Sequence, residues 1–200
     1  MTRAILLDMG NVLVKFDFGR AWTEMAPRLA EPVEVVRGRL RESGLVKRLD
    51  SGQMAQEEFV TRFCELLGVE MGYEEFLEIW NRIFIEQLVP NQMLEALGRR
   101  YPLVLLSNTN PIHFAEIERR FDFLRYFERR VLSHEAGTMK PAPEIYAQAV
   151  AAAGCEAGEC FFADDMPEFV EGALRQGIDA VRFESAAQLE GELRARGVEW

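Results

Sequence analysis

The amino-acid sequence predicts an α/β fold, a doubly wound parallel sheet that carries an inserted helical segment. Apolar runs that end in a polar residue are typical of buried parallel strands, and helical stretches separate these runs along the chain. The predicted strands are residues 4–8, 103–107 and 160–164, with weaker candidates at 131–133 and 180–183. The predicted helices are residues 111–121, 142–153, 167–176 and 186–196. This alternation of strand and helix favours a parallel, doubly wound sheet.

Residues 18–88 interrupt the alternation, because apolar residues repeat there at helical spacing and no strand signal intervenes. The stripes are Phe18, Ala21, Trp22, Met25 and Leu29, then Phe59, Phe63 and Leu66, then Phe76, Ile79, Trp80, Ile83 and Phe84. Such stripes indicate packing between helices rather than cofactor contacts. The sequence therefore predicts an α/β core made of residues 1–17 and 89–200, with a helical cap over residues 18–88 inserted after the first strand.

Composition and charge exclude several classes of partner. The chain of 200 residues has 23 basic and 33 acidic side chains, a net charge of −10, which argues against binding nucleic acid or anionic membranes. No apolar run approaches the ~18 residues of a membrane span, and no signal-peptide pattern opens the chain. The three cysteines, Cys64, Cys155 and Cys160, form no CxxC pair. We therefore expect a cytoplasmic protein with buried thiols.

Four predicted strand ends carry, or lead into, polar residues: Asp8, Ser107, Lys140 and the pair Asp164 and Asp165. Each residue alone has an ordinary explanation as a helix cap or a solvated side chain. Ligands of open parallel sheets, however, bind outside the carboxyl ends of the strands. The sequence therefore predicts that these side chains form one site.

The chemistry of these residues suits a phosphate monoester, which is dianionic and repels an anionic nucleophile. Asp8 and Asp165 can hold one Mg²⁺, a hard cation that bridges to substrate phosphate. Lys140 supplies a second positive charge, Ser107 a hydroxyl donor and Asn108 a backbone N–H. The loop after Asp8 is expected to aim successive backbone N–H groups at the anion. Attack by Asp8 on phosphorus then gives an aspartyl-phosphate intermediate.

The segments that carry these residues resemble the four motifs of the haloacid dehalogenase superfamily. They are residues 8–13 (DMGNVL), 106–110 (LSNTN), 137–146 (GTMKPAPEIY) and 162–165 (FADD). The resemblance spans the whole chain, and the predicted insert is similar to the cap of that superfamily. It implies a Rossmann-like core and a phosphoric monoester hydrolase. The form of the first two motifs is similar to a bacterial subgroup that includes sugar-1-phosphate phosphatases, and the implied substrate is a small phosphorylated metabolite.

The resemblance also implies a role for each residue. Asp8 would be the nucleophile and a Mg²⁺ ligand, together with the backbone carbonyl of Gly10. Asp165 would bind the metal directly and Asp164 through water. Ser107 and Lys140 would bind the substrate phosphate.

The sequence departs from the pattern of most phosphatases in this superfamily at one position. A second Asp, two residues after the nucleophile, usually acts as general acid and base, and here that position is Gly10. General acid–base catalysis contributes roughly 10²–10⁴-fold, so we expect phosphates on acidic leaving groups, such as anomeric, aryl or acyl oxygens, to react fastest. Dehalogenases of the superfamily also lack this Asp. Haloacid dehalogenase chemistry and a non-catalytic phosphate-binding or regulatory protein are therefore the alternatives.

Three further polar residues remain open on sequence grounds. Asp17 lies nine positions after Asp8, where it either caps the helix that begins near Phe18 or faces the site as a cap hinge or substrate contact. His113 and His134 are expected to be structural or solvated rather than catalytic.

Overall fold

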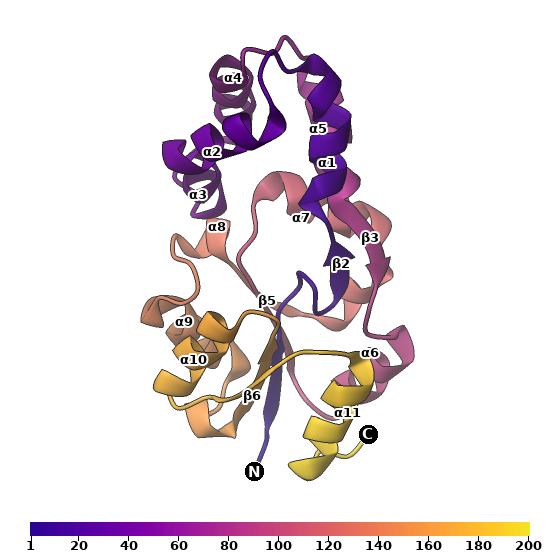
Figure 1. The fold of residues 1–200 in the computed structure, drawn as a ribbon. Coiled ribbons are helices and arrows are strands. Elements are labelled where there is room, and N and C mark those ends of the chain that lie inside the picture. The colour runs from indigo at the N-terminus through magenta and orange to yellow at the C-terminus, as the bar shows by residue number, and fades with distance from the viewer.

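The computed structural model describes residues 1–200 and places a five-stranded parallel sheet at the centre of the core (Figure 1). Its strands are β1 (Ala4–Leu7), β4 (Leu103–Ser107), β5 (Arg129–Leu132), β6 (Cys160–Asp164) and β7 (Asp179–Arg182). The strand order is β5-β4-β1-β6-β7, and every pairing is parallel. The predicted α/β class is thus confirmed. All five predicted strands form, with shifts of one or two residues at the ends of the weaker ones.

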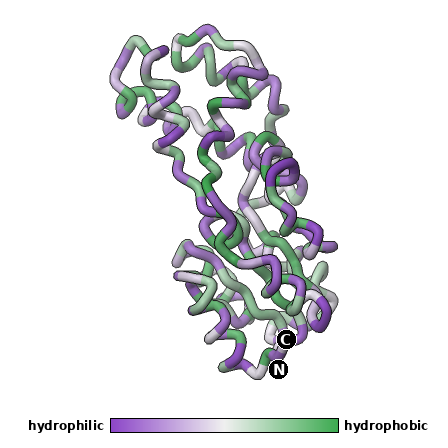
Figure 2. The backbone as a smooth tube through the Cα atoms, turned by 90° about the vertical axis from the view of Figure 1, so that its right-hand side faces the viewer, coloured by the Kyte–Doolittle hydropathy of each residue, from purple (hydrophilic) through white to green (hydrophobic).

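Helices cover both faces of this sheet because side chains of a strand alternate between its faces. Ala4 and Leu6 belong to a buried cluster with α9 and α10, while Ile5 and Leu7 belong to one with α6, α7 and α11. The core helices are α6 (Asn91–Gly98), α7 (Pro111–Arg120), α8 (Ser133–Ala136), α9 (Pro143–Ala153), α10 (Pro167–Arg175) and α11 (Ala186–Ala195). Figure 2 shows hydrophobic residues in the middle of this region and hydrophilic residues along its outer helices. No helix combines the length and hydropathy needed to span a membrane.

The helical insert, defined here as the segment from α1 to α5, stands above the carboxyl ends of the strands (Figure 1). Its helices are α1 (Phe18–Met25), α2 (Val33–Ser43), α3 (Leu45–Asp50), α4 (Gln56–Leu67) and α5 (Tyr73–Trp80). The insert has its own cluster of 16 buried residues, of which only Ile112 comes from outside it. The centre of this cluster is aromatic: the Phe63 ring lies 5.0 Å from Phe76 and 5.2 Å from Trp80. The predicted helical stripes therefore do pack against one another.

A short two-stranded ribbon joins the insert to the core. It pairs β2 (Val14–Phe16) with β3 (Phe84–Gln87) in antiparallel register. The expectation of no strand within residues 18–88 is therefore wrong, since α5 ends at Trp80 and a 3-10 turn leads into β3. The apolar pair Ile83 and Phe84 continues the helical spacing of α5, and only pairing with a strand about 70 residues earlier makes Phe84 extended.

Candidate active site

The side chain of Asp8 is fixed at the centre of the sheet. Asp8 follows the middle strand β1 directly, is 6% exposed, and donates its backbone N–H to the Ala163 carbonyl of β6 (3.0 Å). From β1 the chain builds the sheet first toward β4 and β5 and then, on the other side, toward β6 and β7. Asp8 therefore lies at the point where the direction of winding reverses, and ligands of such sheets bind there.

Lys140 reaches Asp8 from the loop before α9. Its Nζ donates to Asp8 Oδ1 (2.8 Å), to Asp164 Oδ2 (2.5 Å) and to the Leu106 carbonyl (3.0 Å). Burial opposes the charged form of this ammonium, but the charges of Asp8 and Asp164 outweigh burial and raise the pKa of Lys140. A buried cation is thus fixed beside the predicted nucleophile.

Three carboxylates gather at the same place. One oxygen from each of Asp8, Asp164 and Asp165 lies within 4.8 Å of the other two. Burial, and then the charge of Asp8, raise the pKa of Asp164 to about 7, although Lys140 acts in the opposite direction. Burial also raises the pKa of Asp165. One ammonium does not balance three carboxylates, and such an oxygen-rich cluster suits a hard divalent cation.

The hydrogen bonds of these carboxylates distinguish their roles. Both oxygens of Asp164 are engaged, because its Oδ1 accepts from the Met166 N–H (2.9 Å) and its Oδ2 from Lys140. Asp8 accepts from Lys140 through Oδ1, and its Oδ2 accepts no hydrogen bond within the protein. Asp165 accepts from Asn11 Nδ2 through Oδ2 (3.2 Å), and its Oδ1 accepts none. The free oxygens are therefore on Asp8 and Asp165, the two residues predicted to bind metal directly.

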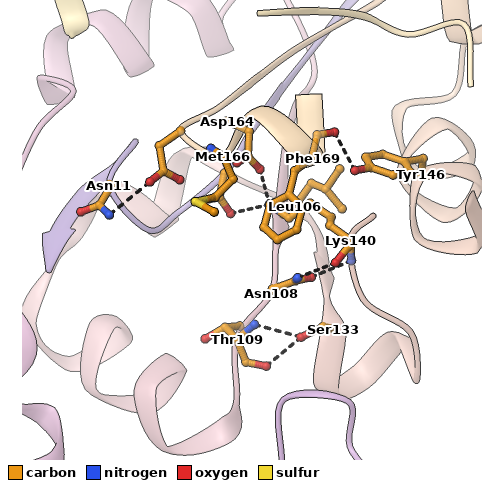
Figure 3. A network of polar contacts seen from close by, with 12 residues as sticks. Asn11, Leu106, Asn108, Thr109, Ser133, Lys140, Tyr146, Asp164, Met166 and Phe169 are labelled. Atoms are coloured by element: carbon orange, nitrogen blue, oxygen red, sulfur yellow. Dashed lines mark hydrogen bonds and ion pairs between the residues drawn. The ribbon is translucent and has the colours of Figure 1, made fainter. Parts of the chain in front are cut away.

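The residues predicted to bind phosphate lie at the carboxyl end of β4. Ser107 is 2% exposed, and its hydroxyl makes no hydrogen bond within the protein. The Asn108 side chain is fully used by Lys140: its Oδ1 accepts from the Lys140 N–H (2.8 Å), and its Nδ2 donates to the Lys140 carbonyl (3.0 Å). Figure 3 shows these two residues side by side. Asn108 thus positions Lys140 through its side chain, a role that the sequence analysis missed.

The loop after Asp8 keeps the N–H groups of Met9 and Gly10 free of hydrogen bonds within the protein, but the N–H of Asn11 departs from the expected row. Asn11 adopts a positive φ of 54°, which Asn tolerates better than most residues. Its N–H donates to the Val14 carbonyl (2.7 Å), so it is not available to an anion. The Gly10 carbonyl, in contrast, accepts no hydrogen bond and remains free for a ligand.

A phenyl ring occupies the space beside Gly10. A Cβ atom at Gly10 would lie 2.6 Å from a ring carbon of Phe16, far closer than carbon atoms approach each other. Any side chain at position 10 therefore requires this ring to move. The absence of an acid at this position and the placement of Phe16 belong to one local arrangement, which the spacing of the motif alone does not show.

The remaining polar residues have structural contacts. Asp17 caps α1, where its side chain accepts from the Gly19 N–H (2.7 Å). His113 is buried and its ring stacks on Trp80 (5.8 Å); burial lowers the pKa of His113 to about 3 and keeps the imidazole neutral. His134 Nδ1 lies 3.1 Å from the Thr109 carbonyl. None of the three side chains hydrogen-bonds to Asp8 or to Lys140.

Known proteins share this architecture. A family model for haloacid dehalogenase-like hydrolases matches residues 2–177. D-ribitol-5-phosphate phosphatase of Bacteroides thetaiotaomicron is 26% identical over 200 residues, which cover 96% of this chain and 97% of that protein. A crystal structure of a haloacid dehalogenase family enzyme from the same organism superposes with a TM-score of 0.86, at 25% identity over 96% of this chain and 98% of that one.

A second crystal structure from that organism contains magnesium and inorganic phosphate. It superposes with a TM-score of 0.81, at 25% identity over 92% of this chain and 96% of that one. The family model covers most of the chain, and the relatives align over nearly its full length. The chain therefore belongs to the haloacid dehalogenase-like hydrolase family and is an enzyme of that family.

Proposed function

We propose that this protein is a Mg²⁺-dependent phosphatase that hydrolyses a small phosphorylated metabolite, of the sugar- or polyol-phosphate kind, through an aspartyl-phosphate on Asp8. The observation that carries this proposal is the position of Asp8. Its carboxylate accepts from the buried ammonium of Lys140 (2.8 Å), and one of its oxygens lies within 4.8 Å of an oxygen of Asp164 and of Asp165. A nucleophile in this setting is adjacent both to a fixed positive charge and to a group of oxygens able to hold a divalent cation.

The donor set fits magnesium. Asp8, Asp165 and the Gly10 carbonyl would hold the ion directly, because each has an oxygen that accepts no hydrogen bond. Asp164, whose two oxygens both accept one, would contact the ion through water. Bound there, the metal would draw charge from the phosphate oxygens and reduce their repulsion of an incoming carboxylate.

The protein residues then have separable tasks in two displacements. The Asp8 carboxylate attacks phosphorus, and the bond from phosphorus to the leaving oxygen breaks as that oxygen takes a proton from solvent. Ser107 donates to the phosphate oxygens while charge develops on them, and Lys140 turns to them the N–H group that it donates to Asp8 in the resting site. Water then attacks the aspartyl-phosphate, loses a proton to solvent, and releases phosphate with restoration of Asp8. No side chain at position 10 assists either proton transfer.

The relatives support phosphatase chemistry over dehalogenation. One acts on ribitol 5-phosphate, and a structural neighbour holds magnesium together with phosphate. A halide leaves without protonation and without a metal, so dehalogenation gives no reason to gather three carboxylates. The cluster at Asp8 therefore favours a phosphate ester as the substrate.

The Asp8→Asn variant tests the proposal. An amide is a poor nucleophile and a poor Mg²⁺ ligand, so we expect loss of phosphate release from a panel of phosphorylated metabolites. EDTA should abolish turnover by the unmodified enzyme, and Mg²⁺ should restore it. Asp122→Asn, at an exposed position remote from the site, is the matched control and should retain activity. Turnover that survives in Asp8→Asn or in EDTA would contradict the mechanism.

A further inference from the structure

The helical insert lines a cavity of about 590 Å³ that reaches the core beside the catalytic lysine. Its walls come from α1, α2, α3 and the end of α5, and its core contact is Met139, the residue before Lys140. Its volume lies within the ~300–1,000 Å³ range of small-molecule sites. The cavity is therefore large enough for the leaving group of a small phosphate ester.

Aromatic side chains connect this cavity to the nucleophile. The Phe16 ring covers Gly10, which lies two residues after Asp8. The rings of Phe16 and Phe18 form a T-shaped contact with their centroids 5.3 Å apart. Phe18 lines the cavity and is 36% exposed although it is large and apolar. Phe16 and Phe18 therefore form an apolar contact that extends from Gly10, beside the nucleophile, to the wall of the cavity.

The cavity also contains cations that no protein carboxylate neutralises. Arg37 pairs with Glu34 (3.1 Å), and the other cavity carboxylate, Asp50, accepts from Asn110 Nδ2 (2.8 Å). Arg41 and Lys47 line the same cavity and make neither an ion pair nor a side-chain hydrogen bond. These contacts leave two unpaired positive charges at a concave site of a chain whose net charge is −10.

We infer that the leaving group carries a second anionic group, a carboxylate or a phosphate, which Arg41 and Lys47 bind while its apolar part lies against Phe18 and Trp22. The inference rests on the proposed function, which places the reacting phosphate at Asp8. It narrows the substrate class from sugar or polyol phosphates in general to those that carry a second acidic group. Arg41 and Lys47 are exposed in the free protein, but a ligand that fills the cavity shields them from water. Charge-assisted hydrogen bonds to them then favour an acidic leaving group over a neutral one.

Three aryl phosphates of similar size and leaving-group acidity test this inference: the 4-carboxymethyl, 4-phosphonomethyl and 4-(2-hydroxyethyl) phenyl esters. Binding of each ester to the Asp8→Asn protein is measured by calorimetry at a Mg²⁺ concentration high enough to offset the weaker amide ligand, so the readout does not need turnover. We expect at least one acidic ester to bind about tenfold more tightly than the hydroxyethyl ester. The acid that gives the preference identifies the second group as a carboxylate or a phosphate.

Variants in the same background assign this preference to residues. Arg41→Gln and Lys47→Gln should each reduce the affinity ratio severalfold, and Arg41→Lys should keep part of it. Arg48→Gln is the matched control, because Arg48 is exposed on α3 but does not line the cavity. Equal affinity for acidic and neutral esters, or an equal loss in Arg48→Gln, would overturn the inference.

A separate measurement tests the proposed function. Mg²⁺-dependent hydrolysis of the neutral hydroxyethyl ester by the unmodified enzyme requires Asp8 and does not involve the second anion. If hydrolysis occurs without an affinity preference, the proposed function stands and the inference fails. If the preference appears without hydrolysis, the cavity assignment stands and the phosphatase mechanism fails.

Discussion

At the scale of single residues, Lys140 is the side chain on which the geometry of the site depends most. Its ammonium is nearly inaccessible and is shared between Asp8 and Asp164. Removal of one partner of a buried ion pair typically costs about 3–5 kcal/mol, whereas an exposed pair contributes about 0–1 kcal/mol. Substitution of a lysine is therefore expected to lower the free energy of unfolding much more at the site than at the surface.

We expect Lys140→Met to lower the free energy of unfolding by about 3–5 kcal/mol and to abolish turnover, because two carboxylates stay buried without their cation. Urea unfolding of the metal-free protein at pH 7 measures the first effect. Lys15→Met is the control, since Lys15 faces Glu86 at 3.8 Å with both side chains more than half exposed. A similar loss of stability in the two variants would show that Lys140 is not a stabilising charge.

Gly10 and Phe16 together should determine how the enzyme responds to leaving groups. With no acid beside the leaving oxygen, we expect a steep negative slope of log kcat/KM against leaving-group pKa for similar-sized esters. We expect kcat/KM for alkyl phosphates to be lower than for phosphates of acidic leaving groups by up to the roughly 10²–10⁴-fold that general acid catalysis contributes. A slope near zero would show that another group supplies the proton.

Restoration of the acid requires a second substitution. Gly10→Asp alone should be poorly active, since its Cβ would collide with the Phe16 ring. Gly10→Asp combined with Phe16→Ala gives the carboxyl room and should flatten the slope of log kcat/KM against leaving-group pKa. Phe16→Ala alone is the control and should leave that slope unchanged. If Gly10→Asp is fully active without the second change, the ring is not the obstacle proposed here.

At the scale of elements, the end of α3 connects the insert to the core. The Asp50 carbonyl accepts from Ser133 Oγ (2.5 Å), and its carboxylate accepts from Asn110 Nδ2 (2.8 Å). Ser133 Oγ in turn accepts from the Thr109 N–H (2.9 Å), a pair visible in Figure 3. Thr109 and Asn110 directly follow Ser107 and Asn108, so this contact links the insert to the loop that would bind phosphate.

The buried carboxylate of Asp50, at this contact between the insert and the core, predicts that stability depends on pH. Burial raises the pKa of Asp50 from 3.8 to about 6, although the Asn110 hydrogen bond acts in the opposite direction. Between pH 4 and 6 the folded protein thus retains a proton that the unfolded chain releases, and the contribution of Asp50 to the free energy of unfolding falls as pH rises. At about 1.4 kcal/mol per pKa unit, the cost above pH 6 is at most about 3 kcal/mol. Arg41 and Lys47 line the same cavity without pairing to this carboxylate.

Asp50→Asn should therefore be more stable than the unmodified protein at pH 7–8, and this advantage should disappear below pH 4. Urea unfolding of both proteins between pH 4 and 8 measures the difference in unfolding free energy. Asp122→Asn, at an exposed aspartate, is the control and should show a difference that does not change with pH. A pH-independent difference for Asp50→Asn would contradict the assigned titration.

At the scale of the whole molecule, we propose that residues 18–88 act as a cap over a core of residues 1–17 and 89–200. Two features support this division: the insert has its own aromatic cluster, and a two-stranded ribbon joins it to the core. Such lids exclude water and recognise the part of the substrate that does not react. The cavity with Arg41 and Lys47 is lined mainly by the insert, so selectivity should depend on it.

Replacement of α1–α5 by a tight turn between β2 and β3 should keep Mg²⁺-dependent hydrolysis of a small activated aryl phosphate. Selectivity among metabolites, measured as the spread of kcat/KM over a substrate panel, should collapse. Circular dichroism checks that the core still folds, and Asp8→Asn in the shortened protein checks that turnover uses the same nucleophile. Selectivity that survives the deletion would place specificity in the core.

The sequence by itself determines the parallel sheet and the set of residues at its carboxyl edge. Runs such as 4–8 and 160–164 are apolar throughout because strands buried on both faces need no alternation, and their ends meet at one edge. The positions of Asp8, Ser107 and Asp164 were predictable on this basis, since parallel topology brings strand ends together whatever their distance in the chain. Lys140 lies beyond α8 and reaches Asp8 from the loop before α9.

Only the tertiary structure decides which atoms remain free and what lies between them. The hydrogen bonds to both oxygens of Asp164, the contact of Asn108 with Lys140 and the Phe16 ring over Gly10 depend on side-chain directions that no spacing encodes. The strand β3 was missed for a related reason, because local apolar periodicity continues a helix there and pairing with β2 overrides it. Local patterns specify elements and their ends, whereas contacts between segments far apart in sequence specify the chemistry that those ends can perform.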